Sequence, residues 1–276
     1  MMRPIVVRGG GDIATGTIYR LCKSGYAVVI LESSQPTAIL RKVAFCEAVY
    51  EGRTMVEDMP CVLAGSAKEA LDLIGQQKKN ERYPVLLVDE KAVSLETLKP
   101  NILIDGILAK KNLGTTKEMA DLVIGFGPGF TAGQDVDYVI ETMRGHDLAR
   151  IIAEGSAMPN TGVPGIIAGI GAERVIHAPA DGIFRKKAHI ADLVKRKELL
   201  GVIEKDGRET PVSASIDGVL RGILRDQFPV YKGLKMADID PRLSEKKNCF
   251  TISDKARCIA GSALELVVNY EKTHLS

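Results

Sequence analysis

Aromatic residues are scarce in this 276-residue chain, and their scarcity disfavours one class of function. The chain has no Trp, and Phe and Tyr together make up only 5% of it. Proteins that bind single-stranded nucleic acids commonly stack bases on aromatic side chains. The formal net charge is also only +2, which is far from the strongly basic character of a nucleic-acid-binding domain. We therefore expect no nucleic-acid partner.

Paired cysteines and long apolar runs are missing as well. The five cysteines are odd in number and form no C-x-x-C motif, which disfavours a disulfide framework or a cysteine zinc site and favours a reducing compartment. No apolar run approaches the roughly 20 residues of a membrane span, and no secretory signal pattern is visible. We expect a soluble cytoplasmic protein with no metal site and no membrane partner.

What is present is an ordinary globular composition with abundant glycine. Hydrophobic residues make up 45% of the chain and charged residues 26%, and there are 27 glycines. Residues 1–150 alternate short β-branched runs such as 27–31 and 85–89 with helical patterns, and a last helix is expected at about 135–142. This alternation predicts an α/β domain with a Rossmann-like, mostly parallel sheet.

A glycine cluster follows the first predicted strand. Gly9, Gly11 and Ala14 form a G-x-G-x-x-A pattern between a strand and a helix, and Glu32 ends the next strand. This context is typical of dinucleotide binding, where the glycines admit a pyrophosphate to the helix N-terminus and the acid holds a ribose hydroxyl. The alternative is a glycine-rich turn that binds nothing, and the carboxylate of Asp12 would repel a phosphate unless it faces away.

Two further segments follow strands and could line the same pocket. Asp105 ends a strand, and Gly127 and Gly129 follow another, so both segments are expected at the carboxyl edge of the sheet. A sharp loop near a crowded edge explains the second segment equally well. The predicted cofactor-binding residues are Gly9, Gly10, Gly11, Asp12, Ala14, Glu32, Asp105, Gly127 and Gly129. No catalytic residue is predicted, and Cys46 is expected to be a buried structural thiol.

The second half of the chain contains an internal repeat. Residues 178–204 match residues 214–240 at a spacing of 36, with Asp181 and Gly182 repeated as Asp217 and Gly218. The segment 178–182 resembles the first strand of biotinyl/lipoyl-like barrel–sandwich hybrids, but Gly207 stands where a carrier domain has its attachment lysine. This resemblance predicts a β barrel–sandwich hybrid without biotin or lipoate. The expected domains are 1–150, 151–245 and a C-terminal helix, 246–276, that packs back on the α/β domain.

Several longer motifs, taken together, resemble one family. They are Val7–Gly16, Arg41–Phe45 with Glu47–Val49, Gly127–Gly133, Arg144–Leu148, Asn160–Gly162 and Ile239–Arg242. The sequence is similar in these motifs to the YqeB-type family of the selenium-dependent molybdenum hydroxylase system. The resemblance implies an accessory role in enzyme maturation, with a molybdenum hydroxylase or its other maturation factors as partners. It implies no catalytic residue.

Three functional hypotheses follow. The first is a cytoplasmic maturation factor that binds a nucleotide or a molybdopterin-dinucleotide-like ligand. The second is an NAD-dependent oxidoreductase, although no Tyr-x-x-x-Lys or similar hydride-transfer constellation is present. The third is a non-enzymatic assembly adaptor with a vestigial glycine turn. The expected cofactor is thus NAD or another dinucleotide such as a molybdopterin dinucleotide, and the sequence does not indicate the oligomeric state.

Overall fold

The computed structural model describes residues 3–162 and 165–274, and the chain divides into two compact units. The larger unit comprises residues 1–36, 43–160 and 252–276, and the smaller unit comprises residues 37–42 and 161–251. The expected division into domains at residues 150 and 245 stays a prediction. Within the described residues, no helix is long and apolar enough to cross a membrane.

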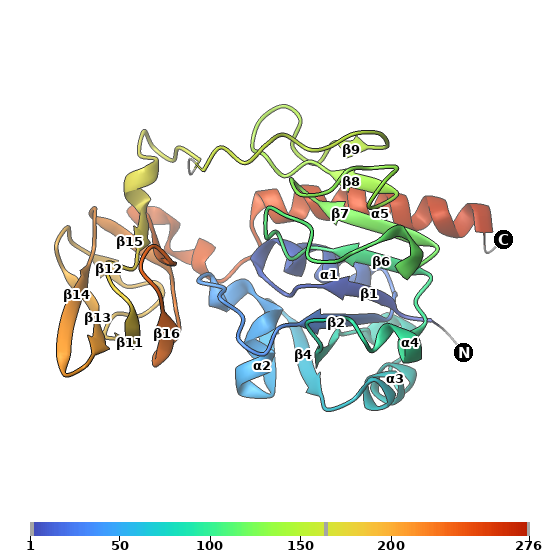
Figure 1. Ribbon diagram of the computed structural model, residues 1–276, viewed down its shortest axis with the longest axis horizontal. Coiled ribbons are helices and arrows are strands. Elements are labelled where there is room, and N and C mark those ends of the chain that lie inside the picture. Colours follow the sequence, from blue (N-terminus) through green and yellow to red (C-terminus); the bar gives the residue numbers. More distant parts are fainter. Residues whose placement is uncertain (1–2, 163–164, 275–276) are drawn as a thin grey trace. The chain divides into compact units, whose positions relative to one another are not determined.

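A nine-stranded mixed sheet forms the centre of the larger unit (Figure 1). Seven neighbouring strands run parallel, and an antiparallel strand closes each edge. In spatial order the strands are β3 (Arg53–Val56), β4 (Met59–Ala64), β5 (Val85–Val88), β2 (Val28–Glu32), β1 (Ile5–Arg8), β6 (Ile102–Asp105), β7 (Leu122–Phe126), β8 (Tyr138–Ile140) and β9 (Ile151–Ile152).

Both faces of this sheet are buried. Val6, Leu103 and Val123 pack on one face in a cluster with apolar side chains of helices α3 (Ala67–Gly75) and α4 (Leu95–Leu98). Their alternating neighbours are also fully buried, because successive side chains of a strand point to opposite faces. Helices α1 (Asp12–Lys23) and α5 (Asp254–His274) pack against each other, and the hydroxyl of Tyr26, just after α1, donates a hydrogen bond of 2.7 Å to Glu271 of α5. A further helix is α2 (Ala48–Glu51).

Helices α3 and α5 each begin after a serine that caps the helix, as serine at this position favours. The hydroxyl of Ser66 accepts a hydrogen bond of 3.2 Å from the backbone N–H of Glu69, and that of Ser253 accepts one of 3.2 Å from Ala256. Such bonds satisfy N–H groups that have no partner within the helix. The helix expected at 135–142 is wrong, because this segment contains β8 instead. Short 3₁₀ helices are η1 (Arg41–Val43), η2 (Phe45–Glu47), η3 (Lys79–Glu81), η4 (Lys117–Met119), η5 (Ala172–Arg174) and η6 (Leu243–Cys249).

The smaller unit contains two four-stranded antiparallel sheets. The first has the order β10 (Val175–His177), β17 (Lys235–Asp240), β15 (Gly218–Ile223) and β12 (Leu193–Val194). The second has the order β14 (Arg208–Ser213), β13 (Leu199–Lys205), β11 (Gly182–Lys186) and β16 (Phe228–Val230). Buried apolar residues of both repeats, such as Phe184 and Leu220, build its core.

The internal repeat exchanges strands between these sheets. Gly182 pairs with Val230, and the positions 36 residues apart pair reciprocally, since Val194 lies opposite Gly218. Each repeat therefore contributes one strand, β12 or β16, to the sheet formed mainly by the other repeat. The carboxylates are exchanged too: Asp181 accepts a hydrogen bond from the N–H of Lys232, and Asp217 accepts one from Arg196. These reciprocal contacts confirm that residues 178–204 and 214–240 are structural repeats.

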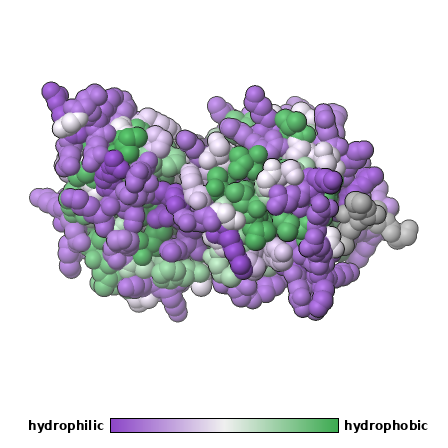
Figure 2. All heavy atoms as spheres, turned by 90° about the horizontal axis from the view of Figure 1, so that it is seen from below, coloured by the Kyte–Doolittle hydropathy of each residue, from purple (hydrophilic) through white to green (hydrophobic). Residues whose placement is uncertain are grey.

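The expected fold class needs correction. The large sheet is mixed, because β3 and β9 run antiparallel at its edges. The smaller unit forms two separate antiparallel sheets, and it gives no positive sign of the expected biotinyl/lipoyl-like barrel–sandwich hybrid. The sequence pattern reveals single strands and their repetition, whereas the pairing depends on contacts between distant segments. On the face drawn in Figure 2, hydrophilic side chains predominate and hydrophobic ones gather in smaller groups.

Candidate functional site

The candidate site lies at the carboxyl edge of the large sheet, beyond β1 and β6. The strand order reverses between these two neighbours, since β2 follows on one side and β7 on the other. Ligands of open α/β sheets commonly bind at such a reversal. Gly9 begins the turn after β1 with a φ of +88°, and a Cβ there would lie 3.0 Å from the backbone N of Ile107. Both the backbone conformation and the space therefore require glycine.

The backbone N–H and carbonyl of the next glycine, Gly10, are both hydrogen-bonded within the protein. The N–H of Gly10 donates a 2.8 Å hydrogen bond to the carboxylate of Glu32, whose other oxygen accepts the N–H of Ser33 at 2.8 Å. The carbonyl of Gly10 accepts the N–H of Cys46 at 2.9 Å, and Phe45 donates to the hydroxyl of Thr15. Burial raises the pKa of Glu32, although these backbone donors oppose the shift.

Gly11 is different, because nothing occupies the space beside it. A Cβ on Gly11 would have no neighbouring atom within 4 Å outside its own chain neighbours. Its φ of −66° and ψ of 174° are open to any residue, and no side chain caps the helix that starts at Asp12. The first N–H groups of an α-helix lack partners within the helix and attract anions. Gly11 thus leaves a path to the start of α1.

The starts of two helices meet at this edge. A Cβ on Gly16 would lie 2.8 Å from Ala256, so α1 and α5 cross closely near their first turns. The helices run in the same direction, because Tyr26 at the far end of α1 reaches Glu271 near the far end of α5. Ala14 serves another contact, since a Cβ on Gly106 would lie 2.8 Å from the Ala14 Cβ. Small residues thus bring α1 close to both α5 and the loop after β6.

A lysine occupies the first turn of α5. The side chain of Lys255 is half-buried. Burial lowers its pKa and the Arg144 guanidinium lowers it further, while the carboxylates of Asp12, Glu141 and Asp254 act in the opposite direction. Within the described part of the chain, no hydrogen bond or ion pair holds its ammonium group.

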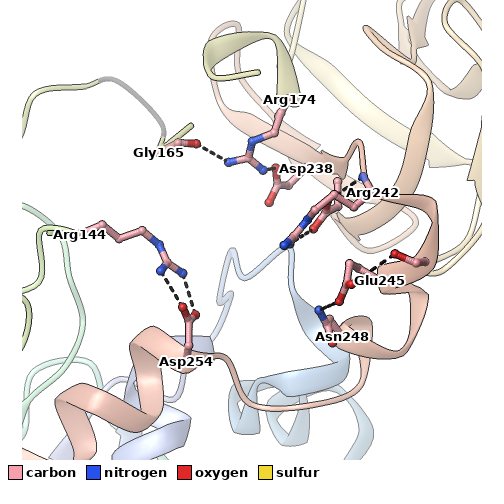
Figure 3. A network of polar contacts seen from close by, with 10 residues as sticks. Arg144, Gly165, Arg174, Asp238, Arg242, Glu245, Asn248 and Asp254 are labelled. Carbon is pink, nitrogen blue, oxygen red and sulfur yellow. Dashed lines mark hydrogen bonds and ion pairs between the residues drawn. The ribbon is translucent and has the colours of Figure 1, made fainter. Parts of the chain in front are cut away.

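Arg144 stands beside this lysine and is positioned by α5. Its guanidinium donates two hydrogen bonds of 2.9 Å to the carboxylate of Asp254 (Figure 3). Such a bidentate pair fixes the orientation of the guanidinium plane. The edge therefore combines an open glycine, two helix N-termini, a half-buried ammonium group and an oriented guanidinium. This arrangement can bind an anion.

Asp105 lies beneath the site, where it is almost completely buried. Its carboxylate accepts the hydroxyl of Thr115 at 2.6 Å and the N–H of Ile107 at 3.1 Å, and it lies 3.6 Å from the Arg8 guanidinium. Arg8 also donates to Thr115 and to the carbonyl of Glu90. Burial raises the pKa of Asp105. This cluster holds the loop after β6 against β1.

The second glycine loop is explained by packing. A Cβ on Gly125 would lie 2.6 Å from the Phe130 ring. On Gly127 it would collide with the Thr142 hydroxyl, and on Gly129 it would lie 2.7 Å from the Lys111 backbone. Gly127 and Gly129 also have φ values of +72° and +115°. These glycines are therefore needed for the loop itself.

The structure thus gathers most of the predicted site residues at one edge but gives them different surroundings. Gly9, Gly10 and Glu32 close the turn, whereas Gly11 is open. Sequence reasoning missed Lys255 and Arg144. The available signal was a lysine two residues after Ser253, in the first turn of a helix, where the helix dipole disfavours a cation. The Cys46 thiol is buried, and burial raises its pKa well above the ordinary value, so it suits a structural role.

Comparisons with solved structures give only weak similarities. An aspartoacylase family protein from Mesorhizobium loti matches 87% of this chain and 86% of its own, with 11% identity and a TM-score of 0.29. The apo ectoine utilization protein EutE (DoeB) from Ruegeria pomeroyi covers 86% and 85%, with 10% identity and a TM-score of 0.27. A succinylglutamate desuccinylase/aspartoacylase from Rhodobacter sphaeroides covers 33% and 30%, with 19% identity and a TM-score of 0.24. Similarity this low transfers neither a fold nor an activity to this chain.

A curated relative gives a much stronger match. The protein YqeB of Escherichia coli (strain K12) is 44% identical to this chain over 265 residues, which cover 96% of the chain and 47% of the relative. The chain therefore spans about half the length of the curated relative that it matches. No protein-family model matches the chain. The long, closely similar alignment with YqeB supports the assignment of this chain to the YqeB-type family.

Proposed function

We propose that this protein is a cytoplasmic accessory factor in the maturation of selenium-dependent molybdenum hydroxylases, and that it binds a phosphate-bearing small molecule at Gly11. The role in maturation rests on the family resemblance, and the ligand class rests on the geometry of the site. A molybdopterin dinucleotide carries the phosphates that this site would take. The partners would be a hydroxylase or its other maturation factors.

The observation that carries the binding proposal is the position of Lys255. A cation in the first turn of a helix opposes the helix dipole, at a cost of about 0.3–1 kcal/mol. Lys255 is also half-buried beside Arg144 and has no ion-pair partner among the described residues. A bound anion between the starts of α1 and α5 would remove both penalties. The carboxylates of Asp12 and Glu141 reduce the net positive charge of the site. An anion would therefore bind through direct contacts with Lys255, Arg144 and the helix N-termini, and not through a general excess of positive charge.

The site can bind the phosphates of a dinucleotide, but it does not provide the usual contact to the ribose. In the usual binding mode an acid after the second strand accepts the ribose hydroxyls, but both carboxylate oxygens of Glu32 here accept backbone N–H groups. Cys46 also packs on Gly10, where a Cβ would lie 3.0 Å from the Cys46 nitrogen. These contacts disfavour the NAD-dependent oxidoreductase. The ligand would instead lie on the side of Lys255 and Arg144.

Identification of the natural cargo tests this function. The protein would be purified from its native cells without added ligands, and small molecules and elements would be measured by mass spectrometry and elemental analysis. We expect a phosphate-bearing pterin, with or without molybdenum. NAD that is reduced on addition of a substrate would support the oxidoreductase instead. A protein that carries no ligand and gains no thermal stability from pterin dinucleotides, nucleotides or NAD would support the assembly adaptor.

A further inference from the structure

The smaller unit carries an excess of positive charge that the proposed site does not use. Its residues, 37–42 and 161–251, include 18 Lys and Arg against 12 Asp and Glu, whereas the rest of the chain has 19 against 23. The net charge of +2 therefore hides a basic unit and an acidic one. Charge of one sign on one unit affects which partners bind it and how fast they associate.

Part of this charge is placed by a short segment that docks on β15. The N–H of Ile223 donates to the carbonyl of Ile39 at 3.0 Å, and the Arg41 guanidinium donates to the carbonyl of Ile223 at 2.9 Å. The segment approaches so closely that a Cβ on Gly222 would lie 2.8 Å from Leu40. Residues 37–42 are thus fixed on the unit, and Arg41 and Lys42 are fixed with them.

The docked segment lies near a third cation. Lys186 ends β11 and is half-buried. Its pKa is lowered by burial and by the charges of Arg41 and Lys42, while Asp226 and Asp192 act in the opposite direction. In the described structure, neither the Lys42 nor the Lys186 ammonium group has an ion-pair or hydrogen-bond partner. We call Arg41, Lys42 and Lys186 the basic surface.

The internal repeat shows that this surface is specific to one half of the unit. Lys186 and Gly222 are 36 residues apart, but a register shift after Leu220 places Gly222 opposite Asp238, so Ile223 occupies the sheet position in the second repeat that Lys186 has in the first. Glycine in the second repeat admits the segment that carries Arg41, and lysine in the first repeat adds a cation near it. The second repeat therefore has no cation at the sheet position that Lys186 occupies in the first repeat.

We propose that the basic surface docks an acidic segment of a partner protein. The Lys42 and Lys186 ammonium groups have no partner among the described residues and lie near the charge of Arg41, and carboxylates of a partner would relieve the resulting repulsion. A protein segment suits the surface better than a nucleic acid, because Asp192 and Asp226 lie near Lys186 and would repel a continuous phosphate backbone. Separate acidic side chains can contact the cations and avoid these two carboxylates.

Binding of a labelled decaglutamate peptide to the whole 276-residue chain tests this proposal. Fluorescence anisotropy would be measured at low salt for the wild type, for the double variant Lys42→Glu/Lys186→Glu and for Lys246→Glu/Lys247→Glu. The control lysines are exposed residues of η6 in the same unit, and the two double variants change the net charge equally. Circular dichroism and thermal unfolding would confirm that all three proteins are folded.

We expect the first variant to bind decaglutamate about tenfold more weakly than the wild type, and the control to stay within about twofold. Decaglutamine should not bind, and 10 mM inorganic phosphate, used here as a competing small anion, should leave the peptide bound. Equal losses in both variants would overturn the proposal, because net charge alone would then explain binding. Tighter binding of a single-stranded DNA of equal charge, with the same sensitivity to Lys42→Glu/Lys186→Glu, would also overturn it in favour of a nucleic acid.

Discussion

The two glycine loops of the larger unit look alike in the sequence and differ in the structure. Gly9–Gly11 follow β1, whereas Gly125 lies within β7 and Gly127 and Gly129 follow it, and both segments lie at the carboxyl edge. In the second loop, each of the three glycines is required by an atom that a Cβ would strike. In the first loop, Gly9 and Gly10 are packed, and Gly11 alone borders open space. The space beside a glycine therefore indicates a binding site better than the number of glycines.

Among substitutions in the two glycine loops, we expect the largest loss of stability at Gly129. In Gly129→Ala the Cβ would lie 2.7 Å from the Lys111 backbone at a φ of +115°. We expect the free energy of unfolding to fall by about 2–4 kcal/mol, measured by urea denaturation. Gly133→Ala is the control, since Gly133 has a φ of +83° and open space, and it should cost about 1 kcal/mol. Equal costs would show that overlap with Lys111 is unimportant.

The second prediction concerns Asp105, whose strand β6 stands between the strands that precede the two loops. Asp105→Asn deprives the buried Arg8 of its carboxylate, so we expect a loss of about 1–3 kcal/mol in the free energy of unfolding. Burial raises the pKa of Asp105, so the folded state holds this proton more tightly than the unfolded state. Wild-type stability should therefore fall as the pH rises from the ordinary pKa through the raised one. The variant should lack this fall, and an identical pH dependence would contradict the assignment.

The third prediction concerns anion binding at Lys255. Lys255→Gln should weaken pyrophosphate binding about tenfold, which corresponds to about 1.4 kcal/mol, when measured by isothermal titration calorimetry. Because the pKa of Lys255 is lowered, wild-type affinity should decline at a pH below the ordinary lysine range, whereas the variant should show no such decline. Lys272→Gln in the last turn of α5 is the control. Unchanged affinity in Lys255→Gln would remove this lysine from the site.

The smallest effect is expected for the stability of Gly11→Ala. The backbone of Gly11 is open to alanine, and the added Cβ meets nothing. The loss of a favoured helix cap and the gain from a stiffer unfolded chain should nearly cancel. We expect a change within about 0.5 kcal/mol in urea denaturation. A loss of 2 kcal/mol or more would mean that Gly11 is structural, like Gly129.

Local features of the fold were predictable from the sequence, and long-range features were not. The β1–α1–β2 unit, the helix caps Ser66 and Ser253 and the 36-residue repeat follow from local patterns. The strand exchange between repeats does not, because it depends on which distant segments pair. The segment 135–142 was misread as a helix because its few apolar residues fit both periodicities.

The candidate site shows the same limit. The sequence indicated the glycine turn and the acid at the end of β2, but it could not show that Glu32 binds Gly10 instead of a ligand. That contact requires the turn to fold back toward the end of β2. Lys255 lies far along the chain from Gly11, so only the packing of α5 on α1 brings it near the turn.

The most direct test of the central claim is pyrophosphate titration of Gly11→Val. The valine side chain would fill the open space beside the start of α1, and Gly75→Val in α3 is the matched control because Gly75 also has no neighbour within 4 Å. We expect the wild type and Gly75→Val to bind pyrophosphate with similar affinity, and Gly11→Val to bind it at least about tenfold more weakly. Equal affinity of all three proteins would contradict an anion site at Gly11.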